Sequence, residues 1–192
     1  MPNLDRRRRL EGAILFVAFA ACVPLANWLI GNVGTVCVPN GPCLIPVAPG
    51  LSAPSGVLAV GLAFVLRDLV QRRLGLLWSA VAIAVGAALS AVFAPPALVL
   101  ASITAFALSE TADLAVYTPL QRRGLVVAAM ASSVVGLVVD SLLFLAVAFG
   151  SLEFLAGQVV GKLWMVIAAL PLLVWLRERD RRVGLAPALT GP

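Results

Sequence analysis

The sequence predicts an all-α integral membrane protein with six transmembrane helices and both termini in the cytoplasm. Three observations support this prediction: the apolar composition, the spacing of the apolar segments and the positions of the arginines. The 192 residues are 61% hydrophobic and 12% charged, with a mean hydropathy of +1.05. A soluble domain typically has about 45–50% apolar and about 25% charged residues. The composition therefore excludes a soluble globular domain.

Six apolar segments follow one another along the chain, most of them close to the length of about 20 residues that a spanning helix needs. They cover residues 12–30, 51–66, 76–94, 97–118, 125–149 and 154–176. The second segment is short, so we expect its helix to continue past Arg67 and Asp68. Pro95-Pro96 separates the third segment from the fourth, and one long kinked helix is the alternative.

The arginines fix the predicted orientation. They lie before the first segment and after the second, fourth and sixth, at Arg6–Arg9, Arg67, Arg72, Arg73, Arg122, Arg123, Arg177, Arg179, Arg181 and Arg182. The other three connections contain no Arg or Lys, so cytoplasmic termini place every arginine on the cytoplasmic side. This pattern accounts for the net charge of +5. We therefore expect a lipid bilayer, and not nucleic acid, as the partner of the basic residues.

This orientation divides the chain into three parts. Residues 1–11 form a basic cytoplasmic N-terminus, residues 12–176 form the six-helix domain, and residues 177–192 form a basic cytoplasmic tail. The N-terminus imitates a secretory signal, but the five further apolar segments favour an uncleaved first span. The predicted location is the inner membrane of a bacterium.

The first outer loop, residues 31–50, is rich in Gly and Pro, which predicts an irregular cap and not a helix. It contains Cys37 and Cys43, six positions apart. On an oxidising face of the membrane these two residues can form a disulfide, and two free thiols are the alternative.

Ionisable residues inside the apolar segments are the strongest functional candidates. A charge at mid-membrane costs about 2.5–3.5 kcal/mol on insertion scales, so such residues are rare without a role. The chain has five of them, with Arg67 at the edge of the set: Asp68, Glu110, Asp113, Asp140 and Lys162. Because a charge that faces lipid is costly, we expect these side chains to point inward and line a polar cavity.

The spacing of these residues places them on single helix faces together with other polar residues. The four groups are Arg67, Asp68 and Gln71 in the second segment, Glu110, Asp113 and Tyr117 in the fourth, Ser133, Gly136 and Asp140 in the fifth, and Gln158 and Lys162 in the sixth.

Lys162 is the single lysine among 14 basic residues. It can form an ion pair with Asp140 or Asp113 that only holds the bundle together, or it can bind substrate, and both interpretations remain open. For Glu110 and Asp113 we favour a function, because two acids on one face exceed what one lysine neutralises.

The chain lacks the usual signatures of catalysis and cofactor binding. It has no His, and its three Cys contain no CxxC pair, so no metal site is predicted. A phosphate-binding loop of the GxxxxGK[ST] type is also missing from the sequence. We therefore expect no cofactor and no catalytic residues, and a protein that is not an enzyme.

Several segments together resemble the queuosine precursor transporter family, also called the VUT family. They are FVLRDLVQ at 64–71, SITAFALSETAD at 102–113, SSVVGLVVDSLLF at 132–144 and the stretch from Gly157-Gln158 to Lys162. The resemblance extends over roughly residues 55–175. It implies a six-helix inner-membrane protein that takes up 7-deazaguanine precursors of queuosine, such as preQ0 and preQ1.

The resemblance carries the polar positions of the family onto Asp68, Ser109, Glu110, Asp113, Ser133, Asp140, Gly157, Gln158 and Lys162. Glu110 stands where a Gln is expected, and Gly136 stands where many members have Ser. The predicted substrate-binding residues are Arg67, Asp68, Gln71, Ser109, Glu110, Asp113, Tyr117, Ser133, Asp140, Gln158 and Lys162.

The chemistry of a guanine-like ring agrees with such a set. One carboxylate can accept from its adjacent N–H and amino groups, and we expect Glu110 or Asp113 in this role. Lys162, Gln158 or Arg67 can donate to the ring carbonyl, and Phe106, Tyr117 or Trp164 can stack on the ring. The alternative function is the substrate-binding subunit of an ATP-energised vitamin or nucleobase uptake complex. A homodimer is a further expectation, because the bundle is small.

Overall fold

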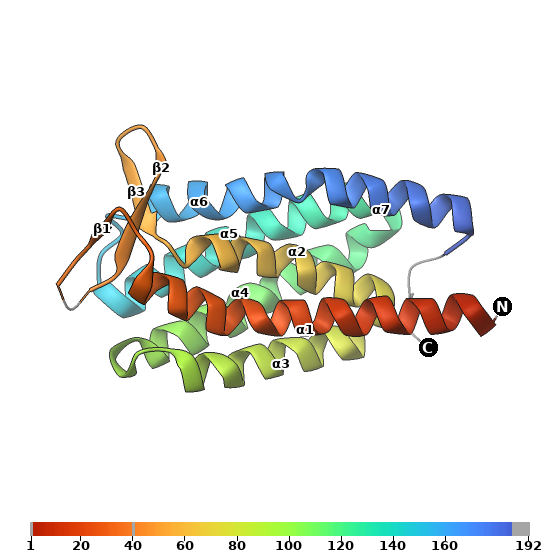
Figure 1. Ribbon diagram of the computed structural model, residues 1–192, viewed down its shortest axis with the longest axis horizontal. Helices are drawn as coiled ribbons and strands as arrows, with labels where there is room; N and C mark the ends of the chain where they lie inside the picture. Colours follow the sequence, from red (N-terminus) through yellow and green to blue (C-terminus); the bar gives the residue numbers. More distant parts are fainter. Residues whose placement is uncertain (1, 40, 186–192) are drawn as a thin grey trace.

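The computed structural model describes residues 2–39 and 41–185. Long helices run side by side along one axis, and a small sheet covers one end of the bundle (Figure 1). The helices are α1 (Pro2–Asn32), α2 (Val57–Leu74), α3 (Leu76–Phe93), α4 (Val99–Leu120), α5 (Leu125–Phe149), α6 (Leu155–Ala168) and α7 (Leu170–Val183), with the short 3-10 helices η1 (Pro96–Leu98) and η2 (Gln121–Arg123). The strands are β1 (Val36–Cys37), β2 (Cys43–Ala48) and β3 (Leu51–Pro54).

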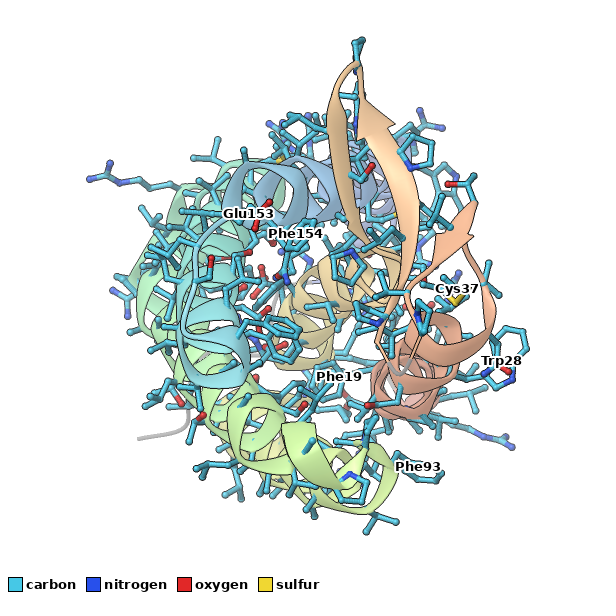
Figure 2. All side chains as sticks on the ribbon, turned by 90° about the vertical axis from the view of Figure 1, so that its left-hand side faces the viewer. Phe19, Trp28, Cys37, Phe93, Glu153 and Phe154 are labelled. Atoms are coloured by element: carbon cyan, nitrogen blue, oxygen red, sulfur yellow. A yellow bond between two sulfur atoms is a disulfide. The ribbon has the colours of Figure 1, made fainter. Side chains whose placement is uncertain are left out.

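Five helical stretches are long and apolar enough to cross a membrane in the described part of the chain. They are Leu4–Asn32, Leu76–Phe93, Pro96–Arg123, Leu125–Phe149 and Leu155–Val183. Large apolar side chains cover their outer surface. Trp28 and Phe93 point away from the bundle, whereas Phe19 points into it (Figure 2). The protein is therefore a helical, multi-pass membrane protein.

Helix α2 is the exception, because it carries Arg67, Asp68, Arg72 and Arg73. It contacts α1, α3, α4, α5 and α6, and 14 of its 18 residues are buried. A helix surrounded by other helices can carry charges, since its polar groups meet protein partners and not lipid. The expected continuation of this helix past Asp68 is confirmed, and it ends at Leu74.

Most predicted helix boundaries lie within two residues of the observed ones, and the bounds of α5 coincide. The break at Pro95-Pro96 is confirmed. The sixth segment is divided at Ala169 into α6 and α7, because Pro171 has no N–H for the i−4 bond and its ring clashes there. Helix α1 begins at Pro2 and α7 ends at Val183, so the arginines at both ends of the chain lie in helices. Met1 and residues 186–192 of the expected terminal segments lie outside the described residues.

The prediction of an all-α fold with an irregular outer loop is wrong in one region. The three strands Val36–Cys37, Cys43–Ala48 and Leu51–Pro54 form an antiparallel sheet in the order β1-β2-β3. The Pro49-Gly50 turn joins β2 to β3, and Gly50 has the positive φ of 73° that such a turn requires. Pro46 is tolerated within β2 because the strand register is irregular between Pro46 and Ala48. Cys37 and Cys43 form a disulfide that joins β1 to β2.

The sheet is anchored on α6. A Cβ at Gly157 would lie 2.1 Å from the backbone oxygen of Ser52, so only glycine permits this close approach. The indole Nε1 of Trp164 donates a hydrogen bond of 2.9 Å to the carbonyl of Val47. Trp164 is 53% exposed, so our expectation that it could stack on a ligand inside the bundle is wrong.

Candidate functional site

All eleven predicted substrate-binding residues are buried inside the bundle. Viewed from the sheet end, oxygen and nitrogen atoms gather in the middle of the ring of helices (Figure 2). The structure brings most of these residues into two neighbouring clusters. The Arg67 cluster consists of Arg67, Asp68, Gln71, Glu110, Asp113 and Tyr117, and the Lys162 cluster consists of Asp140, Ser141, Gln158 and Lys162.

The guanidinium of Arg67 is the centre of the first cluster. Its Nη2 contacts Asp113 and lies 2.5 Å from Asp68 Oδ1, and its Nε lies 3.3 Å from Glu110 Oε2. Its Nη1 donates to Gln71 Oε1 over 3.0 Å. The ring of Tyr117 lies beneath it, with its centroid 5.6 Å from Cζ, which is within the range of a cation–π contact.

The charges of the Arg67 cluster do not balance. Three carboxylates surround one guanidinium, so full ionisation of all groups leaves two negative charges without a counter-charge. Uncompensated buried charge is strongly unfavourable. The cluster can therefore accept positive charge, either as protons or from a ligand that donates hydrogen bonds.

Small polar side chains tie this cluster to neighbouring helices. Ser132 Oγ on α5 donates to Asp68 Oδ2 over 2.7 Å, and Gln71 Nε2 donates to Thr118 Oγ1 on α4 over 3.0 Å. A Cβ at Gly136 would lie 2.7 Å from the Phe64 ring, so glycine allows α5 to approach α2 closely. No feature of the residue pattern distinguished Ser132 and Thr118 from packing residues.

The ammonium of Lys162 is saturated with hydrogen bonds. It donates to Asp140 Oδ2 over 2.6 Å, to Ser141 Oγ over 2.8 Å and to Gln158 Oε1 over 2.7 Å. An ammonium group has three donors, so none remains for another partner. Of the two ion pairs that the sequence left open, the structure forms the one with Asp140. Ser141 was not among the predicted residues.

Asp140 and Gln158 retain hydrogen-bonding capacity beside this pair. The Oδ1 atom of Asp140 accepts only a long contact of 3.4 Å from Ser109 Oγ in the described part of the chain. Because Gln158 accepts from Lys162 through Oε1, its Nε2 group is left as a donor. Lys162 thus holds an acceptor and a donor next to each other.

A cavity of about 90 Å³ lies over the Lys162 cluster, toward the sheet end of the bundle. Asp140, Gln158 and Lys162 line it together with the aromatic rings of Phe106 and Phe144. One water molecule needs about 10–15 Å³ measured in this way, so the cavity has room for several waters or a small ring. Arg67, Glu110 and Asp113 do not line this cavity. The expected polar cavity therefore includes only part of the predicted set.

Two predicted residues, Ser109 and Ser133, belong to neither cluster. Ser109 lies between them, since its hydroxyl faces Asp140 and it directly precedes Glu110 on α4. Ser133 is fully buried, and its hydroxyl has no hydrogen-bond partner among the described residues.

A third set of charges closes the end of the bundle opposite the sheet. This terminal cluster consists of Glu11 on α1, Arg72 and Arg73 on α2, and Arg179 and Asp180 on α7. Arg73 donates to both carboxylate oxygens of Asp180 over 2.9 Å each, and to Glu11 over 2.9 Å. The sequence analysis missed this cluster, because these arginines were interpreted only as markers of the membrane edge.

Comparison with known proteins gives one family. The sequence model of the family described as "Putative vitamin uptake transporter" matches residues 74–176, which is more than half of the chain. The match includes Glu110, Asp113, Asp140 and Lys162, whereas Arg67 and Asp68 precede it. No curated protein and no solved structure matches the chain. Among the described residues, no group of three or more His, Cys, Asp or Glu side chains is placed to hold a metal ion.

Proposed function

The chain belongs to the vitamin uptake transporter family, and from this premise we propose that it imports a 7-deazaguanine such as preQ0 or preQ1. The observation that supports this substrate is the arrangement of the polar side chains that line the cavity. There Asp140 offers an acceptor and Gln158 a donor, side by side, within largely apolar walls. Small-molecule sites typically combine an apolar pocket with a few placed polar groups.

The edge of a guanine-like ring complements this pair. Its ring N–H and amino group donate to Asp140, and its carbonyl accepts from the Nε2 group of Gln158. Phe106 and Phe144 border the cavity and offer apolar rings for the flat face of the substrate. In this proposal Asp140 takes the role that the sequence analysis expected for Glu110 or Asp113, because those two carboxylates are engaged with Arg67.

The proposed topology has six spans, with α2 as the second, and both termini in the cytoplasm. The first residues of α1 and the end of α7 lie at one end of the bundle, and the sheet lies at the other (Figure 1). The arginine-rich connections lie at the terminal end, as positive charges do on the cytoplasmic side. The Cys37–Cys43 disulfide then faces the oxidising periplasm of a bacterium.

Uptake of radiolabelled preQ0 into liposomes that contain the purified protein tests this proposal. We expect saturable uptake that unlabelled preQ1 inhibits more strongly than guanine. Asp140→Asn should lower uptake at least about tenfold, because the loss of one charged hydrogen bond of about 1.5–3 kcal/mol corresponds to that factor or more. Asp5→Asn, an exposed change of the same type on α1, is the matched control.

The same preparation distinguishes the alternative function. Binding of preQ0 without any transport by the chain alone would favour the substrate-binding subunit of an ATP-energised complex. If preQ0, preQ1 and guanine all fail to bind, the 7-deazaguanine proposal is wrong.

A further inference from the structure

The buried charges of the two inner clusters are unequal in number. Four carboxylates face two cations across the Arg67 and Lys162 clusters, and all six residues are buried: Asp68, Glu110, Asp113, Asp140, Arg67 and Lys162. Full ionisation would leave a net charge of −2 in a region of low dielectric constant, which is strongly unfavourable.

The four carboxylates are not compensated to the same degree. Asp140 has the ammonium of Lys162 at 2.6 Å, and Asp68 and Asp113 share the Nη2 group of Arg67. Glu110 has only the Nε group of Arg67, at 3.3 Å. Glu110 is therefore the carboxylate with the weakest ionic partner.

Glu110 also lies close to two residues of the cavity wall, Asp140 and Cys22, whose ionisable groups interact electrostatically with it. The preceding residue, Ser109, has its hydroxyl 3.4 Å from Asp140 Oδ1, and Asp140 borders the cavity. The Ser109 hydroxyl also donates to the carbonyl of Phe106, so it ties α4 to the cavity wall one residue before Glu110. Glu110 therefore lies next to the cavity wall, where a proton can arrive from cavity water.

The ionisable groups around Glu110 come from five helices. They are Cys22 on α1, Arg67 and Asp68 on α2, Asp113 and Tyr117 on α4, Asp140 on α5 and Lys162 on α6, whereas α3 has no ionisable residue. Neither Arg67 nor Lys162 can neutralise Glu110 fully, because each of these cations already pairs with another carboxylate.

A second observation indicates that the Arg67 cluster is incomplete as it stands. Asp113 Oδ2 and the hydroxyl of Tyr117 are buried without a hydrogen-bond partner in the described part of the chain. Buried polar atoms are almost always hydrogen-bonded, so each exception requires an explanation, such as a functional role or a bound ion or water. An added proton is the smallest ligand that could supply the donor that Asp113 Oδ2 lacks within this cluster.

We propose that Glu110 is a proton-binding site that couples the movement of one proton to the movement of the substrate; this inference rests on the proposed transport function. A hydronium ion in the cavity gives its proton to the Glu110 carboxylate, so that one O–H bond forms and one water molecule is released. When the site opens to the cytoplasm, that O–H bond breaks and cytoplasmic water takes the proton. One proton therefore crosses the membrane inward with each substrate molecule.

Infrared spectroscopy of the full-length protein tests the proton site without any substrate. We expect the wild type at neutral pH to show the C=O stretching band of a buried carboxylic acid, and Glu110→Gln to lack it. Glu178→Gln, which changes a partly exposed acid on α7, should retain the band. A band of equal strength in wild type and Glu110→Gln would overturn the proposal, even where the transport function holds.

Transport in liposomes tests the coupling. With preQ0 as the neutral probe and the membrane potential clamped to zero, a gradient of one pH unit should give about tenfold accumulation through one coupled proton. Glu110→Gln should abolish this accumulation but still exchange labelled for unlabelled preQ0, because exchange needs no net proton movement. Exchange by the wild type without pH-driven accumulation would refute the coupling alone, whereas the absence of exchange would refute the transport function as well.

Discussion

Helix α2 supplies the central arginines of two charged clusters that differ in their balance. Arg73 lies in the terminal cluster, where three arginines meet two carboxylates and the rim is partly exposed, with Glu11 at 20% and Arg179 at 18%. Arg67 lies six positions earlier, fully buried among three carboxylates. In the terminal cluster each carboxylate has at least two cationic partners, whereas in the Arg67 cluster the carboxylates outnumber the cation.

This difference separates two uses of buried charge in one helix. The terminal cluster, in which every carboxylate is paired, holds α1, α2 and α7 together, since Arg73 bridges Glu11 and Asp180. The Arg67 cluster, with its excess of carboxylates, is neutral only while additional positive charge is bound, so it can bind and release such charge. The terminal cluster should therefore affect stability, and the Arg67 cluster should affect both stability and transport.

The largest expected effect is that of Arg67→Ala. This change leaves Asp68, Glu110 and Asp113 without their shared cation, and breaking a buried ion pair costs about 3–5 kcal/mol. We expect a large loss of folded protein in detergent, measured by fluorescence-detected size exclusion and thermal unfolding. Arg122→Ala, which removes an exposed arginine, is the control. Equal unfolding temperatures for the two variants would show that the ion pairs of Arg67 do not stabilise the folded protein.

Asp180→Ala should have the next largest effect. It removes the carboxylate that accepts from both Arg72 and Arg73. Hydrogen bonds to charged groups contribute about 1.5–3 kcal/mol, so we expect a loss of about 2 kcal/mol in the free energy of unfolding. The surviving folded protein should take up preQ0 at the wild-type rate per molecule. A loss of transport beyond the loss of folded protein would contradict the division between the two clusters.

Much of the helical frame could be predicted from the sequence, and the reasons are local. Gly124 and Gly150 flank a largely apolar segment without Pro, so the bounds of α5 follow directly from the residue pattern. The spacing of Glu110 and Asp113 places both on one face of α4, and both are buried as expected. Such features depend only on residues a few positions apart.

The rest depends on neighbours that the sequence does not reveal. Lys162 had two possible acidic partners, and the choice of Asp140 follows from how α5 packs against α6. Glu11 and Asp180 lie near opposite ends of the chain and meet only because α1 and α7 both meet α2 at one end of the bundle. The sheet was missed because the Gly and Pro content of residues 31–50 indicated an irregular loop, and because Leu51–Pro54 was included in the second apolar segment.

The smallest expected effect is that of Arg179→Ala, at the partly exposed rim of the terminal cluster. Arg179 donates to Glu11 over 2.6 Å and lies over the Trp175 ring, but water reaches its side chain. Exposed ion pairs contribute about 0.2–1 kcal/mol and are screened by salt. The difference in unfolding temperature from the wild type should therefore shrink as salt is raised. The effect of Arg67→Ala should persist at every salt concentration, because no ion reaches its fully buried partners. A salt-insensitive Arg179→Ala variant would mean that the rim is as dry as the Arg67 cluster, and exposure would then no longer distinguish the two sites.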